Sequence, residues 1–320
     1  MQRKEPLSRF QASRIWSRED IAEFAFPQPP RAKSRLLQRR DGGAHGMRHV
    51  SAPGLPAAGD ITLVPELMLP RRRLQARGQS VEPLFVYPPD GRHVFKDTTF
   101  PWRACGRVTT NAGQGAGALV GPRHLLTASH LIGWTGSDAG WLQFQPDFYD
   151  TDVFPSSYAD AVYSYEKTAT PSGAYDAAED YVVVVLKDRL GDQLGWLGTT
   201  TYADDWDGGS YWSHVGYPGA VGGGTRPAWE LWFSIANSWP SGSGSDIETF
   251  ASLNQGDSGG PVFGWWPEGG PYGGYAAGPY IVAVVSGQGA PAAADGRTGN
   301  WLAGGSELPD LVNEAVADCP

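Results

Sequence analysis

The sequence has no apolar run long enough to cross a bilayer, and it has only two cysteines, Cys105 and Cys319, in 320 residues. A membrane-spanning helix needs about 20 predominantly apolar residues, so we expect no membrane contact. Two cysteines so far apart lack the spacing of metal ligands, and we expect neither a metal nor a cofactor. Basic residues are too few for a general nucleic-acid binder, because 25 Lys and Arg against 34 Asp and Glu leave a net charge of -9.

The start of the chain also lacks the apolar stretch of about 7 to 15 residues that characterises a secretory signal peptide. From residue 1 to about 77, basic clusters and prolines recur without sustained periodicity, and acidic residues concentrate afterwards. This change of composition predicts a poorly structured leader over residues 1–80, either a disordered tail or a propeptide, with a short helix around 17–26. Residues 81–320 are expected to form one large domain.

Charged residues make up only 18% of the chain, whereas 43 glycines and 26 prolines indicate many turns between short strands. The fold class predicted is therefore all-β. Strand-length apolar or alternating runs occur at 102–110, 117–120, 124–127, 181–186, 211–216, 230–236, 261–265 and 280–286. Apolar residues at helical spacing predict one C-terminal α-helix over about 307–319.

Three segments carry the residue types of nucleophilic catalysis. Ser258 lies in the small-residue turn Gly256–Pro261, His130 follows a predicted strand, and Asp180 precedes the apolar run 181–186. A serine hydroxyl is a poor nucleophile near neutral pH unless an imidazole removes its proton and a carboxylate holds that imidazole in the useful tautomer. The three segments can supply all of these parts, in the order His, Asp, Ser.

Chain order separates the folds that use this chemistry. Residues 256–260 also satisfy the G-x-S-x-G pattern of an α/β-hydrolase, but no histidine follows Ser258 to act as its base. A subtilisin order would need an acid before the histidine, and Asp60 and Asp97 lack an apolar, strand-like setting. The histidines that precede Ser258 are His45, His49, His93, His124, His130 and His214.

Each segment also has an ordinary structural interpretation. Gly-Asp-Ser-Gly is common turn chemistry, a single histidine is often structural, and an aspartate often starts a strand. His124 is a second candidate base, but it follows a Gly-Pro-Arg turn and is expected to face solvent. Asp176 competes with Asp180, but it lies in a polar loop rather than beside an apolar run. For the site to be non-catalytic, all three ordinary interpretations would have to be correct at once. The combination therefore favours catalysis.

The segments 121–130, 180–186 and 256–261 resemble the signature blocks of chymotrypsin-like (trypsin-like) serine peptidases. Segments 100–103 and 214–219 are similar to blocks of the secreted bacterial and fungal branch that includes glutamyl endopeptidases, and the resemblance covers roughly residues 85–320. It implies two six-stranded antiparallel β-barrels packed together, the first over about 100–200 and the second over about 205–305. It also implies an extracellular, monomeric endopeptidase that acts on protein or peptide substrates.

The resemblance assigns roles to individual residues. Ser258 would be the nucleophile, His130 the general base and Asp180 the residue that orients it, while backbone N–H groups of Gly256 and Ser258 would form the oxyanion hole. Asp257 would form an activating ion pair with an α-amino group freed by cleavage. We expect that cleavage between residues 73 and 86, where basic residues precede apolar ones.

The substrate pocket and the cysteines carry further expectations from the resemblance. Ser252, six residues before the nucleophile, would form the base of the pocket, while Val285, Ser286 and Gly287 would bind an extended substrate. No acid marks the pocket for Arg or Lys, and the histidine of glutamyl-specific relatives is missing from 284–287, so a neutral or apolar side chain is preferred.

Cys105 and Cys319 could form a disulfide in an exported protein, whereas the frequent cysteine after the catalytic histidine is replaced by Leu131. Two alternatives to a peptidase remain: a serine esterase with the same triad, and an inactive relative that only binds proteins.

Overall fold

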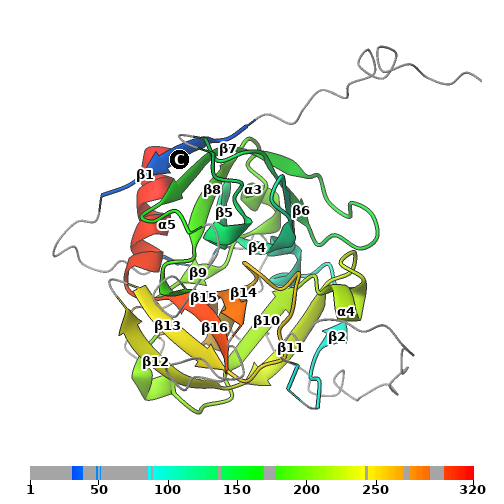
Figure 1. Ribbon diagram of the computed structural model, residues 1–320, viewed down its shortest axis with the longest axis vertical. Coiled ribbons are helices and arrows are strands. Elements are labelled where there is room, and N and C mark those ends of the chain that lie inside the picture. Colours follow the sequence, from blue (N-terminus) through cyan, green and yellow to red (C-terminus); the bar gives the residue numbers. More distant parts are fainter. Residues whose placement is uncertain are drawn as a thin grey trace, which may run out of the picture.

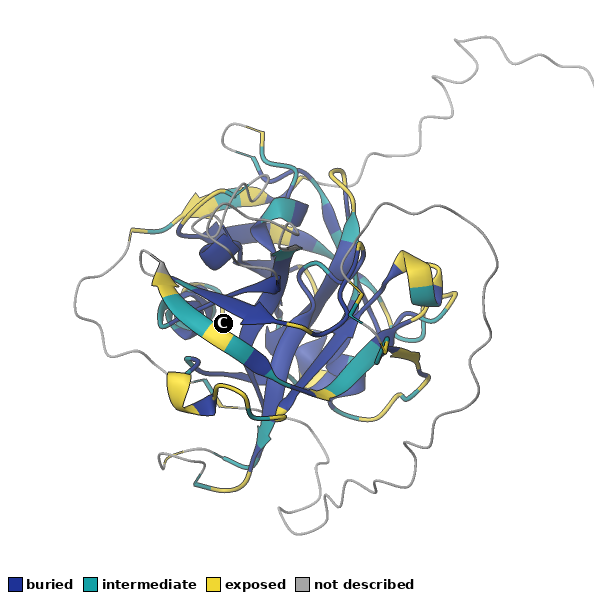
Figure 2. Ribbon diagram, turned by 60° about the horizontal axis from the view of Figure 1, so that its bottom comes forward, coloured by how far each residue is buried: buried dark blue, intermediate teal, exposed yellow. Residues whose placement is uncertain are grey.

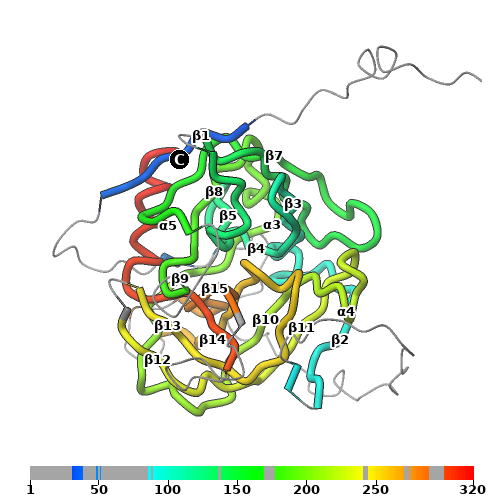
Figure 3. Tube along the Cα trace, viewed as in Figure 1, coloured from blue at the N-terminus to red at the C-terminus, as the bar shows by residue number. Residues whose placement is uncertain are grey.

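The computed structural model describes residues 31–38, 48–49, 51, 86–87, 89–135, 138–168, 177–241, 244–269, 274, 276–288 and 299–320 (Figure 1). The helix expected around 17–26, the residue Asp176 and most of the expected cleavage region lie outside the described residues. Two β-structures make up the fold, and in the tube view the green first half lies above the yellow and orange second half (Figure 3).

The first half is a closed barrel of six antiparallel strands. They are β3 (Cys105–Thr110), β4 (Gln114–Gly121), β5 (His124–Thr127), β6 (Leu142–Pro146), β7 (Ser157–Ser164) and β8 (Val182–Leu186). The strand order is β7-β6-β3-β4-β5-β8, and a ladder between β7 and β8 closes the ring. Every residue of β8 is buried, as expected of a continuous apolar run in the middle of a core.

The second half is a sheet that curls into a half-barrel. It contains β10 (Trp212–Gly216), β11 (Ala228–Phe233), β12 (Ile235–Ser241), β13 (Gly244–Thr249), β14 (Pro261–Trp266), β15 (Gly278–Gln288) and β16 (Asn300–Gly304). The order is β12-β13-β16-β15-β14-β10-β11, with β2 (His93–Val94) beside β11 and β9 (Gly198–Thr199) beside β15. Among the described strands no ladder joins the two ends of this sheet, whereas the first barrel is closed.

The C-terminal helix is confirmed as α5 (Glu307–Asp318). Its apolar stripe, with Leu308, Leu311 and Val312, is fully buried and packs on β8 and β5. The other described helices are single turns: η2 (Trp102–Ala104), η3 (Ser129–Leu131), α3 (Gly191–Leu194), η4 (Asp204–Trp206) and α4 (Gly219–Gly222). Across the described ranges, no helix combines the length and apolarity needed to span a membrane.

Part of the expected leader is built into the folded domain. Residues Lys33–Leu36 form β1, which pairs in parallel with β7 and adds a strand to the outside of the first barrel (Figure 1). Arg48 and Ser51 exchange backbone hydrogen bonds with Thr199 and Trp196. The expectation of a poorly structured leader over all of 1–80 is therefore wrong for these residues, because edge pairing uses backbone groups that composition does not reveal.

Burial separates the interior strands from the exposed turns (Figure 2). His124 lies in the buried group, which corrects the expectation that it faces solvent. It belongs to β5, between β4 and β8, and burial together with the charge of Arg48 lowers the pKa of its imidazole to about 4. Its neutral ring is therefore a structural part of the barrel.

Candidate active site

His130 is positioned by a single helical turn that follows a fully buried strand. β5 ends at Thr127, whose hydroxyl donates to the Ala116 carbonyl at 2.7 Å, and the turn η3 then carries His130 away from the core. Its side chain is 18% exposed, while Ser129 and Leu131 on either side are buried. The turn therefore holds the imidazole at the surface of the barrel without freedom to leave it.

Asp180 is fully buried at the start of β8 and accepts three hydrogen bonds. Oδ1 accepts from the backbone N–H of His130 at 2.8 Å. Oδ2 lies 2.6 Å from His130 Nδ1 and accepts from the Ser286 hydroxyl at 2.7 Å. Since an ionised carboxylate only accepts, the neutral imidazole of His130 carries its proton on Nδ1 and keeps its lone pair on Nε2. This tautomer is the one that a general base requires.

Ser258 lies in the loop between β13 and β14, and that loop is tied to both halves of the fold. The Ser258 carbonyl accepts from Ala116 N–H of the first barrel at 2.8 Å. On the other side, Gly259 N–H donates to the Val285 carbonyl at 2.7 Å, and Val285 N–H donates to the Gly260 carbonyl at 3.0 Å. These bonds bring the serine to the seam where His130 and Asp180 lie.

The loop of Ser258 packs directly on the turn that precedes His130. A β-carbon at Gly259 would collide with the Thr127 hydroxyl, and Gly259 has a φ of +75°, which only glycine adopts freely. In the part of the chain that the structure describes, the hydrogen bonds of the site join His130, Asp180 and Ser286, and none includes the Ser258 hydroxyl. Catalytic hydrogen bonds are often long before substrate binds.

Two backbone N–H groups of the serine loop have no hydrogen-bond acceptor among the described residues. Within the described residues, the N–H groups of Asp257, Gly259 and Gly260 donate to backbone carbonyls, whereas those of Gly256 and Ser258 donate to none. Gly256 has a φ of +103°, and a β-carbon there would collide with the Tyr217 carbonyl. Glycine is therefore required at this position, and both N–H groups are left to bind an anionic oxygen.

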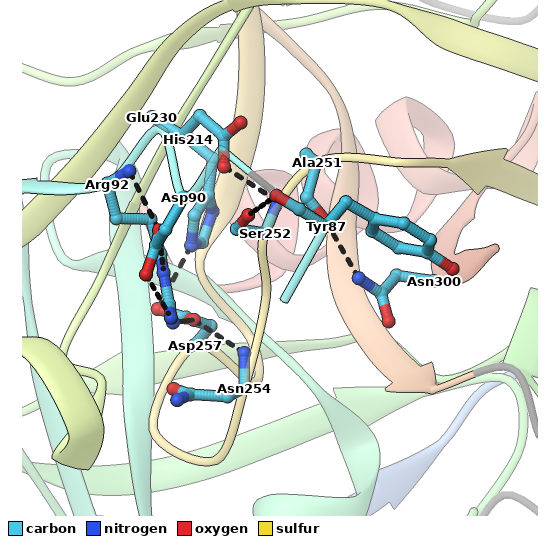
Figure 4. Close-up of polar contacts among 10 residues, drawn as sticks. All are labelled: Tyr87, Asp90, Arg92, His214, Glu230, Ala251, Ser252, Asn254, Asp257 and Asn300. Carbon is cyan, nitrogen blue, oxygen red and sulfur yellow. Dashed lines mark hydrogen bonds and ion pairs between the residues drawn. The ribbon is translucent and has the colours of Figure 1, made fainter. Parts of the chain in front are cut away.

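Asp257 is buried and bound by side chains that the sequence analysis did not identify (Figure 4). Its Oδ2 accepts from Arg92 Nη1 at 3.3 Å and from Asn254 N–H at 2.8 Å, while Oδ1 lies 3.3 Å from Nε2 of His214. Arg92 also binds Asp90, through Nε at 3.0 Å and Nη2 at 3.1 Å. No local pattern marks this cluster, because Arg92 and Asp257 are 165 residues apart.

Charges within the cluster favour the ionised form of Arg92 and disfavour the ionised form of Glu230. Burial alone lowers the pKa of the Arg92 guanidinium, but its bonds to Asp90 and Asp257 outweigh that effect and raise the pKa. Burial raises the pKa of Glu230 to about 7, although its hydrogen bond from Ser252 N–H at 2.7 Å works in the opposite direction. The carboxylates of Asp90 and Asp257 raise this pKa further.

The expected pocket residues have different environments. Ser252 is buried, and its hydroxyl donates to the Tyr87 carbonyl at 3.1 Å (Figure 4). Val285 uses its N–H and C=O groups to hold Gly260 and Gly259, which differs from the expectation that it binds substrate. At Ser286 the ladder between β15 and β16 is irregular, and this irregularity leaves the serine free to reach Asp180 while Gly287 pairs with Trp301.

The structure holds Cys105 and Cys319 as free cysteines, which corrects the expected disulfide. Cys105 is buried in β3, whereas Cys319 follows α5 and lies 3.5 Å from the Tyr163 hydroxyl of β7. Cys105 is therefore on β3 while Cys319 lies against β7, and β6 separates these two strands in the sheet. Among the described residues, no cluster of three His, Cys, Asp or Glu side chains could hold a metal ion.

The fold thus consists of two β-structures, and the segments that carry a histidine, an aspartate and a serine meet at the seam between them. No protein-family model matches the chain. The chain is 29% identical to the glutamyl endopeptidase of Bacillus licheniformis over 178 residues, which are 54% of this chain and 52% of that protein. It thus spans about half the length of the curated relative it matches.

A solved structure has the same fold. The structure of a Glu endopeptidase in complex with MPD covers 73% of this chain and 100% of its own, with a TM-score of 0.56 and 19% identity. The chain therefore has the chymotrypsin-like fold.

Proposed function

We propose that this protein is a serine endopeptidase that cleaves peptide bonds through an acyl-enzyme on Ser258. The observation that supports this most strongly is the three-fold hydrogen bonding of buried Asp180, which orients His130 and holds the proton of its neutral ring on Nδ1. A structural histidine would need no such tautomer. The free N–H groups of Gly256 and Ser258 supply the second requirement, a site for a developing oxyanion.

The reaction proceeds in two halves. Ser258 Oγ attacks the carbonyl carbon while His130 Nε2 takes the hydroxyl proton, and Asp180 stabilises the imidazolium that forms. The proton then passes from His130 to the leaving amine as the C–N bond breaks. Water, deprotonated by the same imidazole, hydrolyses the acyl-enzyme and returns Ser258 to its starting form. In both halves the carbonyl oxygen becomes negative and is bound by the N–H groups of Gly256 and Ser258.

The pocket supports a preference for a neutral side chain before the cleaved bond. Ser252, at the expected base, has its hydroxyl committed to the Tyr87 carbonyl and its N–H committed to Glu230. The Glu230 carboxylate beside Ser252 would repel an acidic substrate side chain. The described strand β15 also carries no histidine to neutralise such a substrate, whereas the relative in the sequence match is a glutamyl endopeptidase. Ser286 and Gly287 would offer main-chain groups to an extended substrate.

Hydrolysis of a protein and of a simple ester by the purified chain tests this proposal. Ser258→Ala and His130→Ala should each abolish peptide cleavage, since loss of the nucleophile or base costs on the order of a millionfold in turnover. Ser210→Ala is a matched control, because its hydroxyl is exposed and contacts only Ser234 among the described residues. Retained activity in either site variant would refute the assignment, and cleavage of the ester alone would indicate an esterase.

A mixed peptide library, analysed for the residue before each cut, tests the pocket. Cuts after neutral or apolar residues are expected, and cuts confined to glutamate would overturn the preference. The extracellular location and the monomeric state remain predictions from the resemblance, and the boundary near residue 80 remains a prediction from composition.

A further inference from the structure

We propose that Arg92 is the permanent counter-ion of Asp257 and holds the oxyanion loop in its working shape, so that no freed α-amino group is needed. The inference rests on the proposed function for its kinetic consequences. Its structural part concerns the shape of the loop itself. Arg92 would be a positioning residue, because it acts through Asp257 and does not reach the reacting atoms.

The Asp257 carboxylate is closely enclosed, although among the described residues only its Oδ2 accepts hydrogen bonds and Oδ1 accepts none. Arg92 and Asn254 both donate to its Oδ2, and His214 lies against its Oδ1. On the remaining side, a β-carbon at Gly216 would collide with Oδ1, which shows how tightly the backbone of β10 covers the carboxylate. An incoming α-amino group would have to displace Arg92, whose side chain is 1% exposed.

The guanidinium is held in place before any cleavage event. Asp90 binds the Nε and Nη2 atoms, so the outer edge of the group is fixed and Nη1 is left to face Asp257 (Figure 4). Asp90 also accepts from the backbone N–H of Arg92 at 3.1 Å, which fixes the turn that carries both residues. This turn leads into β2, which pairs with β11 of the second half. The counter-ion is thus anchored to the same sheet as the loop it supports.

The link from Arg92 to the oxyanion hole is short. Asp257 lies between Gly256 and Ser258, the two residues whose N–H groups are free to bind the oxyanion. Because the Asp257 carboxylate is pulled into the protein by Arg92, these flanking N–H groups are turned toward the substrate side. An unpaired, buried Asp257 would instead turn toward solvent and take the loop with it, since an uncompensated buried charge is strongly unfavourable.

The same turn also supports the pocket. The carbonyl of Tyr87 accepts from the Ser252 hydroxyl, and the Tyr87 ring packs edge-on against Phe250 at 5.2 Å between ring centres. Tyr87 therefore contacts the base of the pocket, and Arg92 contacts the back of the oxyanion loop.

The test compares the full chain with Arg92→Met and with the full chain acetylated at its α-amino group. Acetylation should leave kcat within twofold of the untreated protein. Arg92→Met should lower kcat by about a hundredfold or more with KM changed less than threefold, because removal of one oxyanion donor alone costs about 10²–10³ in kcat. Arg92→Lys, which keeps the charge, should recover part of this loss. Arg226→Met is the matched control, since it breaks an exposed Arg–Asp pair with Asp150.

A structural measurement separates this inference from the proposed function. The amide resonances of Gly256 and Ser258 should shift in Arg92→Met and remain unchanged in Arg226→Met. If Arg92→Met does not fold, the same resonances are measured in Arg92→Gln, which also removes the charge. Unshifted resonances would overturn the inference, as would activity that appears only after a new α-amino group is freed. If the wild-type chain cleaves nothing either before or after its leader is removed, the proposed function fails, and the resonances still decide the role of Arg92.

Discussion

Asp180→Asn gives the sharpest test of how the site holds its base. Three donors converge on the carboxylate, and the backbone N–H of His130 at Oδ1 cannot become an acceptor. The amide oxygen must therefore take the Oδ1 position, which places the amide NH₂ opposite His130 Nδ1 and the Ser286 hydroxyl. The hydroxyl can rotate to accept, but the imidazole can accept only by moving its proton to Nε2.

The expected consequence is a large loss of kcat with the fold intact. With the proton on Nε2, His130 cannot take the proton of Ser258, and the same tautomer error in a triad lowers kcat by about 10⁴. KM should change little, because Asp180 is fully buried and does not contact substrate. Steady-state hydrolysis of a peptide substrate at pH 8 gives both constants, and the thermal midpoint shows that the variant is folded.

Ser286→Ala is the control for this prediction. It removes one of the three bonds but leaves both contacts between Asp180 and His130, so the tautomer is kept and kcat should fall about tenfold, the effect of losing one hydrogen bond to a charged group. A folded Asp180→Asn variant with kcat within tenfold of the wild type would refute the tautomer argument. Equal losses in Asp180→Asn and Ser286→Ala would refute it as well.

Three further predictions concern stability and redox state. The raised pKa of Glu230, about 7 against an ordinary 4.5, means that its contribution to stability is fully present below pH 4.5 and is lost as the pH rises through 7. Glu230→Gln should remove this loss of stability, which is about 3 kcal/mol. Urea unfolding at pH 4, 6 and 8 should therefore show the free energy of unfolding of the variant rising relative to that of the wild type as the pH increases. A difference in unfolding free energy that does not change with pH would contradict the assignment. Gly216→Ala should destabilise the protein by about 1–3 kcal/mol and lower kcat through its collision with Asp257, whereas Gly219→Ala, which meets no atom within 4 Å, should not; equal unfolding midpoints would count against the tight packing around Asp257. Thiol titration of the denatured, unreduced protein should find both cysteines free, and a result of none would restore the disulfide.

Much of the fold could be predicted because its strands follow apolar runs. The run 181–186 became β8, the run 211–216 became β10, and the helical spacing near the C-terminus became α5. Strands with polar or mixed sequences were missed: β13 reads GSDIET and β16 reads NWLAG. They form because neighbouring strands satisfy their backbone groups, and tertiary pairing of this kind leaves no local periodicity.

The residues of the site also fall into two groups: some are recognisable from their local sequence, and others only from contacts with distant parts of the chain. His130, Asp180 and Ser258 could be proposed from their order and their local settings, and the structure brings the segments that carry them to one seam. Arg92 and Asp90 could not be proposed, because their importance depends on a contact with a carboxylate in a distant loop. The same limit applies to Cys319, whose neighbour Tyr163 is fixed by the packing of α5.

Labelling with a fluorophosphonate probe, followed by peptide mapping, tests the central claim most directly. The probe reacts only with a serine whose hydroxyl is activated. The account predicts one modified residue, Ser258, and no modification in His130→Ala. A chain that cleaves peptides while Ser258 stays unmodified, or a label on another serine, would contradict it.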